Sequence, residues 1–210
     1  MIMNTIVSKY DVKIKRKKIK HTYIRVVDGC VVVTTNYLTP KIYINKLIKD
    51  NSSKIEKMFA SDKRKQELDK DFYLFGKRYE IVFDDLENDV VVDGDKIISR
   101  NQEALNKYVD NLIKKIYLER LNFWYNRFEE KIPVPNLKIR RMKTRWGVCN
   151  IKNHNVTLNY FLFKYDLECL DYVIVHELSH FLEGNHSSNF WKVVSKYYPN
   201  YKETRKKLRS

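Results

Sequence analysis

Apolar and polar residues alternate along much of the first hundred positions, the pattern of strands that bury one face. Three pairs of such runs, rich in Val, Ile, Tyr and Phe, each surround a short stretch that contains glycine. A glycine beside a polar residue between two β-branched runs is typical of a tight hairpin turn. The expected turns lie at Asp28-Gly29, near Gly76-Lys77 and at Asp93-Gly94.

A helical insert separates the first pair of strands from the second. Pro40 stands at a helix-opening position, directly before residues 41–50. A second helical run covers residues 53–70, where Ser53 and Glu56 have the spacing of a capping box. We therefore expect two consecutive helices between strands.

The hydrophobic period changes near Asn101, where a long helix is predicted over residues 101–131. Pro133 and Pro135 would prevent its continuation, because proline lacks the backbone donor that a helix needs. The predicted apolar stripe consists of Leu105, Val109, Leu112 and Ile116, continued by Leu121, Trp124 and Phe128.

The remaining chain mixes strands and helices. Residues 136–143 and 155–160 are expected to form strands, and residues 166–184 a helix that Gly184 can end. Two further helices are expected over residues 187–198 and 201–209.

Three of the five histidines lie close together in the stretch VIVHELSHFLEGNHSSNFW. His176, Glu177 and His180 form an HExxH motif on a predicted helix. Side chains four residues apart share one helical face, so both imidazoles can bind one small cation. Glu177 is offset by one residue and can reach a metal-bound water without being a ligand. This arrangement, two His ligands and a Glu base, defines zincins and predicts a Zn²⁺ site.

A catalytic zinc ion needs a third protein ligand. His186 follows Gly184, which lets the chain leave the helix and fold back, and we favour His186 as that ligand. Glu183 is the alternative, since it lies seven residues after His176 on the same helical face. A carboxylate at that position could bind the metal or orient an imidazole.

These elements predict an α+β fold in two parts. A strand-rich part with the helical insert covers residues 1–100, and a minimal zincin-type metallopeptidase domain with the HExxH helix covers residues 101–210. The change of period near residue 100 is the candidate boundary, although the two parts are expected to form one continuous unit.

The stretch KTRWGVCN, residues 143–150, is the second candidate for chemistry. In one interpretation, Arg145 faces the metal cleft and acts in catalysis by stabilising negative charge as water attacks. In the other, Arg145 lies on the surface beside a core Trp146 and a tight turn at Gly147. Asn159 and Tyr160 are weaker candidates for lining the cleft.

The charge balance is strongly basic, with 41 Lys and Arg against 26 Asp and Glu and a formal net charge of +15. Such a charge favours anionic partners, among them nucleic acid, nucleotides, acidic proteins and lipid head groups, without choosing among them. Basic runs at residues 13–21 and 201–210 leave nucleic-acid binding and a merely solvated surface both open.

The cysteines and the apolar runs narrow the class of protein. Cys30, Cys149 and Cys169 are odd in number and far apart, which excludes a disulfide framework, and the chain has no CxxC pair for a zinc site. The first residues lack the apolar core of a signal peptide, and no apolar run has the length of a membrane span. We expect a cytoplasmic protein with no membrane partner.

Residues 16–33, 143–150, 156–194 and 199–208 together resemble YgjP-like metallopeptidase domain proteins, which are zincins related to the SprT-like group. The resemblance covers nearly the whole chain and is most specific from Lys143 onward. It implies that His176, His180 and His186 hold zinc and that Glu177 is the catalytic base. One departure is Val148, where the family usually has serine.

We therefore expect a zinc metallohydrolase, most simply a metallopeptidase that acts on a peptide substrate. A nucleoside-triphosphate pyrophosphatase using the same metal and an anionic nucleotide substrate is the first alternative. The second is a nucleic-acid-binding protein with a structural zinc, which would require a fourth protein ligand. The substrate, the physiological metal and the oligomeric state stay open at this stage.

Overall fold

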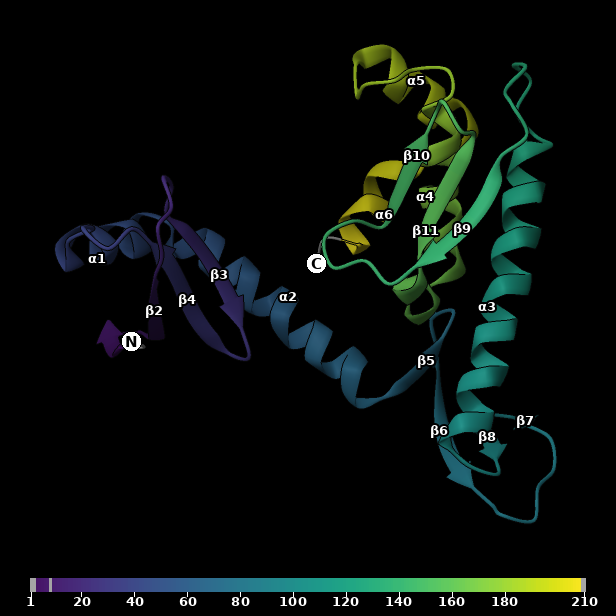
Figure 1. The fold of residues 1–210 in the computed structure, drawn as a ribbon, viewed down its shortest axis with the longest axis horizontal. Helices are drawn as coiled ribbons and strands as arrows, with labels where there is room; N and C mark the ends of the chain where they lie inside the picture. Colours follow the sequence, from purple (N-terminus) through teal and green to yellow (C-terminus); the bar gives the residue numbers. More distant parts are fainter. Residues whose placement is uncertain (1–2, 8, 209–210) are drawn as a thin grey trace. The chain divides into compact units, whose positions relative to one another are not determined.

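The chain divides into two compact units (Figure 1). The computed structural model describes residues 3–7 and 9–208, with side chains described at 9–63 and 71–208. One unit ends at Lys70 and the other runs from Asp71 to Leu208. The change of period near residue 100 therefore lies inside the second unit. The predicted α+β class is confirmed.

The first unit is a four-stranded sheet covered on one face by two helices. The sheet order is β1-β2-β4-β3, with β2 and β4 parallel and the other neighbours antiparallel. Alternate strand residues point toward the helices and form a core with them. The elements are β1 (Met3–Val7), β2 (Tyr10–Arg16), β3 (Tyr23–Val27), β4 (Cys30–Thr35), α1 (Lys41–Asp50) and α2 (Ser52–Lys70). The buried core residues are Val12, Ile14, Val31, Val33, Ile44, Ile48 and Ile55.

The predicted hairpin at Asp28-Gly29 is confirmed, and both turn residues have the positive φ that a two-residue hairpin favours, 52° and 71°. The predicted capping box is wrong. Helix α2 begins at Ser52, so Ser53 lies inside its first turn. Glu56 instead accepts a hydrogen bond of 2.8 Å from the hydroxyl of Tyr10 on the neighbouring sheet.

The second unit contains two sheets and the remaining helices. One sheet has the order β5-β6-β8-β7 and the other the order β10-β11-β9. The strands are β5 (Phe72–Leu74), β6 (Lys77–Phe83), β7 (Val91–Asp93), β8 (Lys96–Ser99), β9 (Asn136–Arg140), β10 (Gly147–Asn150) and β11 (Asn155–Asn159). The helices are α3 (Gln102–Tyr125), the 3-10 helix η1 (Tyr160–Lys164), α4 (Leu167–Ser179), α5 (Ser188–Tyr197) and α6 (Tyr201–Lys207).

Two predicted turns in this unit lie one residue away from their expected positions. Leu74 pairs with Lys77, so Phe75 and Gly76 form the turn, with φ of 48° and 83°. Asp93 pairs with Lys96, so the other turn is Gly94-Asp95. A bulky residue at positive φ is rare, so local preference favours a turn at Gly76-Lys77 over the observed turn at Phe75-Gly76.

Helix α3 confirms the long predicted helix but not its full stripe. Asn101 caps its start by accepting a hydrogen bond of 2.9 Å from Ala104 N–H. The helix ends at Tyr125, so Phe128 lies beyond it. Buried positions recur every four residues, and the predicted Leu112 and Ile116 are only partly buried. The buried residues are Leu105, Val109, Ile113, Tyr117 and Leu121.

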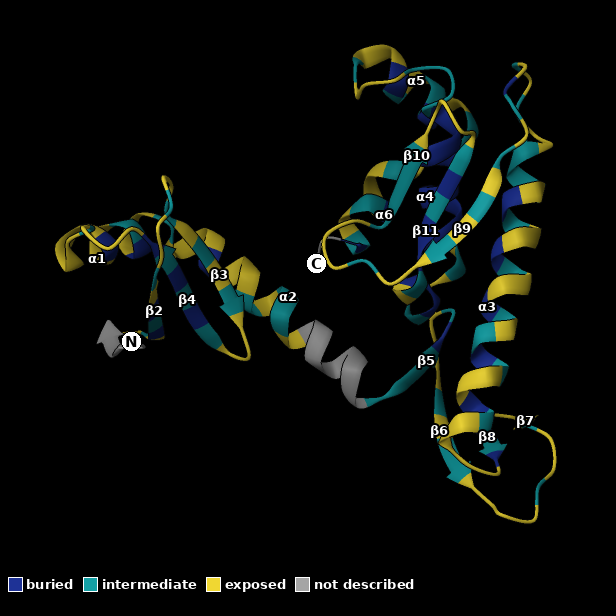
Figure 2. Ribbon diagram, in the orientation of Figure 1, coloured by how far each residue is buried: buried dark blue, intermediate teal, exposed yellow. Residues whose placement is uncertain are grey.

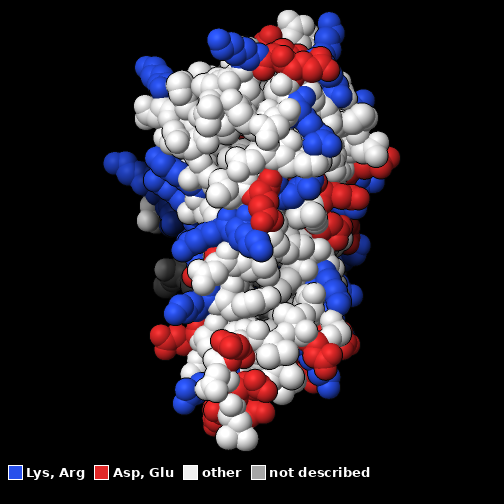
Figure 3. All heavy atoms as spheres, turned by 90° about the vertical axis from the view of Figure 1, so that its right-hand side faces the viewer, with Lys and Arg blue, Asp and Glu red and all other residues white. Residues whose placement is uncertain are grey.

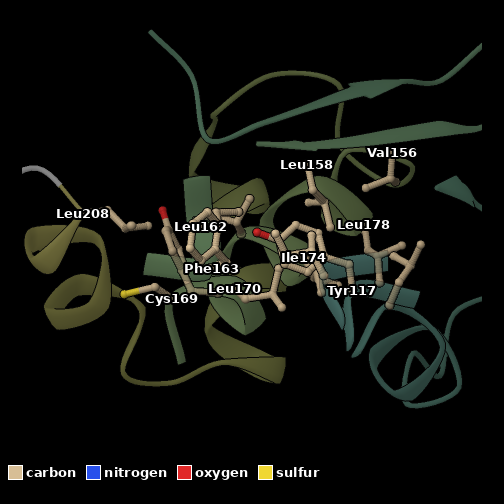
Figure 4. Close-up of a cluster of buried hydrophobic side chains, with 14 of the residues drawn as sticks. Tyr117, Val156, Leu158, Leu162, Phe163, Cys169, Leu170, Ile174, Leu178 and Leu208 are labelled. Carbon is tan, nitrogen blue, oxygen red and sulfur yellow. The ribbon is translucent and has the colours of Figure 1, made fainter. Parts of the chain in front are cut away.

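Helix α4 is the centre of the second unit (Figures 1 and 2). Nearly all of its residues are buried, because α3, the β10-β11-β9 sheet, α5 and α6 surround it. Ile174 and Leu178 pack in the same core as Tyr117, Val156 and Leu158 (Figure 4). This burial holds the HExxH residues, which lie at the end of the helix, on a rigid support.

A charged pair also ties α4 to α3. The guanidinium of Arg120 donates two hydrogen bonds of 2.7 Å to the carboxylate of Asp171. Such a paired geometry fixes orientation as well as distance. Elsewhere on the face that includes α3, positive and negative side chains are interspersed (Figure 3). None of the described helices combines the length and the hydropathy that crossing a membrane requires.

Candidate metal centre

The end of α4 places two of the three candidate histidine ligands. The helix ends at Ser179, five residues before the predicted end at Gly184, and His180 is its C-cap residue. His180 keeps helical dihedral angles, φ −67° and ψ −18°, so it still lies one turn after His176 on the same face. The chain then turns, with Glu183 N–H bonded to the carbonyl of Ser179 at 3.0 Å.

The structure brings His176, His180 and His186 together. The ligand atoms of the three side chains all lie within 4.8 Å of one another, and the Nε2 atoms of His176 and His186 are 3.0 Å apart. Tetrahedral zinc with Zn–N bonds of ~2.0–2.1 Å separates its nitrogen ligands by about 3.3 Å. Three imidazoles converging at this spacing therefore fit a zinc ion.

Glu183, the alternative third ligand, contributes its backbone instead. Its carbonyl oxygen lies 3.1 Å from Nδ1 of His180. A carbonyl can only accept, so this contact places the proton on Nδ1 and leaves Nε2 free to bind a metal. Within the described part of the chain, the Glu183 carboxylate is not among the groups that converge.

Burial favours the neutral form of His176 and of His180. Burial lowers the pKa of His176 to about 3, and the nearby His180, His186 and Arg205 act in the same direction. Burial also lowers the pKa of His180, although the Glu183 carbonyl opposes this shift. Neutral imidazole is the form that binds a metal, so these two side chains are in the binding form near neutral pH.

Phe190 forms an apolar floor beneath the cluster. It is fully buried, and its ring centroid lies 4.6–4.9 Å from those of all three histidines. Ser187 positions this ring by capping α5, since its hydroxyl accepts a hydrogen bond of 3.3 Å from Phe190 N–H. The N-terminus of α5 therefore fixes both the loop that carries His186 and the Phe190 ring that packs against the three imidazoles.

Glu177 points away from the histidine face and toward strand β10. Its side chain is only 4% exposed, and a Cβ built on Gly147 would lie 2.4 Å from its Oε1 atom. Burial raises the pKa of Glu177 to about 8, while a hydrogen bond from the backbone of Cys149 and the charge of Arg145 lower it. Gly147 is therefore required for close approach of this carboxylate.

Arg145 lies beside Glu177, close enough for its charge to act on that carboxylate. Its side chain is exposed, and no ion pair of Arg145 occurs in the described part of the chain. The loop that carries it is fixed by its backbone, since Asn159 Nδ2 donates to the carbonyls of Arg145 at 2.7 Å and Met142 at 2.9 Å. The guanidinium is thus left available on a rigid loop.

The two weaker candidates have structural contacts. Asn159 is 3% exposed, and its Oδ1 accepts hydrogen bonds from the N–H groups of Met142 and Phe161 in addition to the donations above. The hydroxyl of Tyr160 donates to Asp110 of α3 at 2.7 Å. Asn159 therefore fixes the loop of Arg145, and Tyr160 joins η1 to α3.

The loop before β10 is joined to the C-terminal end of α6. The indole Nε1 of Trp146 donates to the carbonyl of Leu208 at 3.1 Å, and its ring contacts Tyr165 edge to face. On α6, the guanidinium carbon of Arg205 lies 4.7 Å from the ring centroid of Trp191. Sequence reasoning missed Arg205, because a basic run on a short helix usually means a solvated surface.

With this geometry established, the chain can be compared with known proteins. A sequence profile of the YgjP-like metallopeptidase domain matches residues 20–210. The chain belongs to the YgjP-like metallopeptidase domain family. Membership confirms the resemblance and supports a metallopeptidase-like hydrolase that binds a metal. A search of curated proteins found no significant match.

Two solved structures are similar to part of this YgjP-like chain. The metallopeptidase zymogen abylysin of Pyrococcus abyssi is 22% identical with a TM-score of 0.37, over 46% of this chain and 90% of abylysin. The metallopeptidase zymogen jannalysin of Methanocaldococcus jannaschii is 30% identical with a TM-score of 0.35, over 46% of this chain and 92% of jannalysin.

Proposed function

We propose that the chain is a zinc-dependent peptidase in which Glu177 is the general base. The observation that carries this proposal is the position of Glu177, buried against Gly147 and one residue off the face on which His176, His180 and His186 converge. Family membership supports the reaction class. The three-histidine donor set supports zinc, because imidazole suits this ion and three protein ligands leave a position open.

Each residue has a distinct role in this reaction. A zinc ion in such a site lowers the pKa of water toward ~7 and polarises a carbonyl. The carboxylate of Glu177 accepts a proton as the water oxygen bonds to the scissile carbon. Glu177 then transfers that proton to the amide nitrogen as the C–N bond breaks. Arg145 stabilises the negative charge that develops on the carbonyl oxygen.

The rigid supports around the site serve this chemistry. Phe190 and the buried face of α4 keep water away from the rear of the imidazoles, which strengthens electrostatic interactions inside the site. The hydrogen bond from Cys149 fixes the Glu177 carboxylate in one orientation. A positioned base of this kind contributes typically ~10²–10⁴-fold in rate.

The decisive experiment compares the wild-type protein with Glu177→Gln. Both proteins are loaded with zinc and assayed against casein and against nucleoside triphosphates, with and without a chelator. We expect chelator-sensitive hydrolysis of casein by the wild type, and loss of that hydrolysis in Glu177→Gln with an unchanged zinc content. Hydrolysis of the triphosphates alone would replace the peptidase proposal with a pyrophosphatase acting at the same metal.

A non-catalytic role for zinc gives a different result. A structural zinc has four protein ligands, whereas three converge in the described part of the chain. If zinc binds, stabilises the fold and supports no hydrolysis of either substrate class, the site is structural and the proposal is wrong.

A further inference from the structure

Arg205 differs from the other cations of α6. Lys202 and Lys206 are exposed, and Lys207 pairs with Glu168 at 3.2 Å and Asp166 at 3.4 Å. Arg205 is partly buried and stacks over the ring of Trp191. The described part of the chain gives it no acidic partner. A guanidinium held in this way is neither a solvated surface charge nor half of an ion pair.

Stacked aromatic rings connect Arg205 to His186, the third candidate ligand. His186 and Trp191 are 5.8 Å apart and nearly parallel, at 22°, and Trp191 and Tyr201 are 5.1 Å apart at 17°. Tyr201 and Arg205 are four residues apart on α6, so both face Trp191 from one side of the helix. Helix α6 therefore carries a positive charge to the edge of the histidine cluster.

The charge of Arg205 also acts on the cluster itself, since it contributes to lowering the pKa of His176. A guanidinium stacked on an indole keeps its N–H donors free at the edge of the group. Those donors match the two oxygens of a carboxylate, which arginine binds bidentately. Arg145, the other cation whose charge acts on the site, lies beside Glu177 on the loop that Trp146 joins to α6.

We propose that Arg205 binds a carboxylate of the peptide substrate beside the three-histidine cluster, and so makes the site selective for peptides with a negative charge near the scissile bond. This inference rests on the proposed peptidase function. The carboxylate is either the C-terminus of the peptide or an acidic side chain, since both present the same pair of oxygens. A role limited to bracing Trp191 would give no such selectivity.

The test uses four matched peptides and three proteins. The peptides share one sequence and differ only in Glu or Gln two residues after the scissile bond, and in a free or amidated C-terminus. The proteins are the wild type, Arg205→Gln and the control Lys206→Gln, which removes the same charge from an exposed neighbour on the same helix. All are loaded with zinc and their zinc content is measured.

We expect the wild type and Lys206→Gln to prefer one carboxylate-bearing peptide by about 10–100-fold in kcat/KM, the usual range for a hydrogen bond to a charged group. In Arg205→Gln this preference should disappear, mainly through KM, while the zinc content stays unchanged. The pair of peptides that shows the preference identifies the carboxylate. A preference that survives in Arg205→Gln overturns the proposal, as does loss of zinc in that variant.

A binding measurement separates failure of this inference from failure of the peptidase proposal. Zinc-loaded Glu177→Gln protein is titrated with the same peptides, and the emission of Trp191 is followed with Trp191→Phe as the control. We expect carboxylate-dependent binding that Arg205→Gln abolishes. Binding without hydrolysis by the wild type would contradict the peptidase proposal alone. Equal binding of charged and neutral peptides would contradict the role of Arg205 alone.

Discussion

The carboxylate of Glu177 lies where the side chain of residue 147 would be, so that only glycine at this position leaves room for it. A Cβ on Gly147 would meet three atoms of Glu177 at 2.4–2.8 Å. The conformation of Gly147 does not itself require glycine, because its φ is outside the left-handed region. The glycine of the RWG stretch is therefore a contact requirement of the proposed base.

Gly147→Ala should displace Glu177 without removing a metal ligand. We expect an unchanged zinc content, a loss of hydrolysis of about 10²-fold or more, and a loss of stability of about 1–3 kcal/mol from overpacking. Metal analysis, peptide hydrolysis and thermal unfolding measure the three effects. Gly184→Ala is the matched control, since its Cβ would meet only Ile151 Cδ1 at 3.8 Å. Full activity in Gly147→Ala would show that the Glu177 position is unimportant.

The ligand set predicts a stoichiometry of one zinc per chain. His176→Ala, His180→Ala and His186→Ala should each weaken zinc binding strongly, whereas Glu183→Ala should retain it because only the Glu183 backbone contacts His180. Metal analysis after dialysis against a weak chelator measures this. His154→Ala serves as the control, because His154 is not among the histidines whose ligand atoms converge. Retention of zinc by His186→Ala together with its loss from Glu183→Ala would exchange the two assignments.

The buried Glu177 predicts a pH-dependent stability of the metal-free protein. Its pKa is about 8 when folded, against 4.5 as the ordinary value. Between these pH values the folded chain holds a proton that the unfolded chain has released, so stability falls as pH rises through this window. Glu177→Gln lacks this loss. The free energy of unfolding of Glu177→Gln relative to that of the wild type should therefore rise from pH 4.5 to pH 8. The rise should reach on the order of a few kcal/mol and level off above pH 8.

Thermal unfolding of both metal-free proteins between pH 4 and pH 9 measures the difference. His176 titrates in both proteins, and its contribution cancels in the comparison. A constant difference across this range would mean that Glu177 is ionised and well solvated in the folded chain.

The Asn159 side chain predicts a separate effect on the loop of Arg145. Replacing it with Ala removes the hydrogen bonds that hold the partly buried backbone of Met142 and Arg145, each worth about 0.5–1.5 kcal/mol. We expect Asn159→Ala to unfold at a lower temperature and to hydrolyse peptides more slowly, with zinc retained. Arg145→Gln should slow peptide hydrolysis about as much as Asn159→Ala does, but it should leave the unfolding temperature unchanged. Equal unfolding temperatures for Asn159→Ala and the wild type would contradict the role of this side chain.

Spacing within one short stretch was enough to predict the histidine cluster. His176 and His180 share a helical face whatever surrounds the helix, and His186 follows so soon that it can reach the same point. The position of Glu177 off that face follows from the same geometry. The predicted third ligand and the predicted base stay predictions until the variants above are measured, but the structure places both where the spacing indicated.

Contacts between distant segments could not be read from the sequence. The need for glycine at position 147 comes from Glu177, thirty residues later, and the position of Arg205 comes from Trp191 on another helix. The turn at Phe75 has a similar origin. Its N–H bonds to Phe163 O at 2.6 Å, and Gly76 lies against Asp166, so tertiary packing holds a phenylalanine at a φ that local preference disfavours.

The bond from Trp146 to Leu208 spans 62 residues, whereas the contact between His176 and His186 spans only ten. Closing a short loop is entropically cheaper and faster than closing a long one. The histidines can thus come together soon after α4 forms, while the bond that joins the loop of Arg145 to α6 can form only when the last turn of α6 has docked. We therefore expect the three histidines to come together before the loop of Arg145 is joined to α6, so that a folding intermediate could bind a metal before the site is complete.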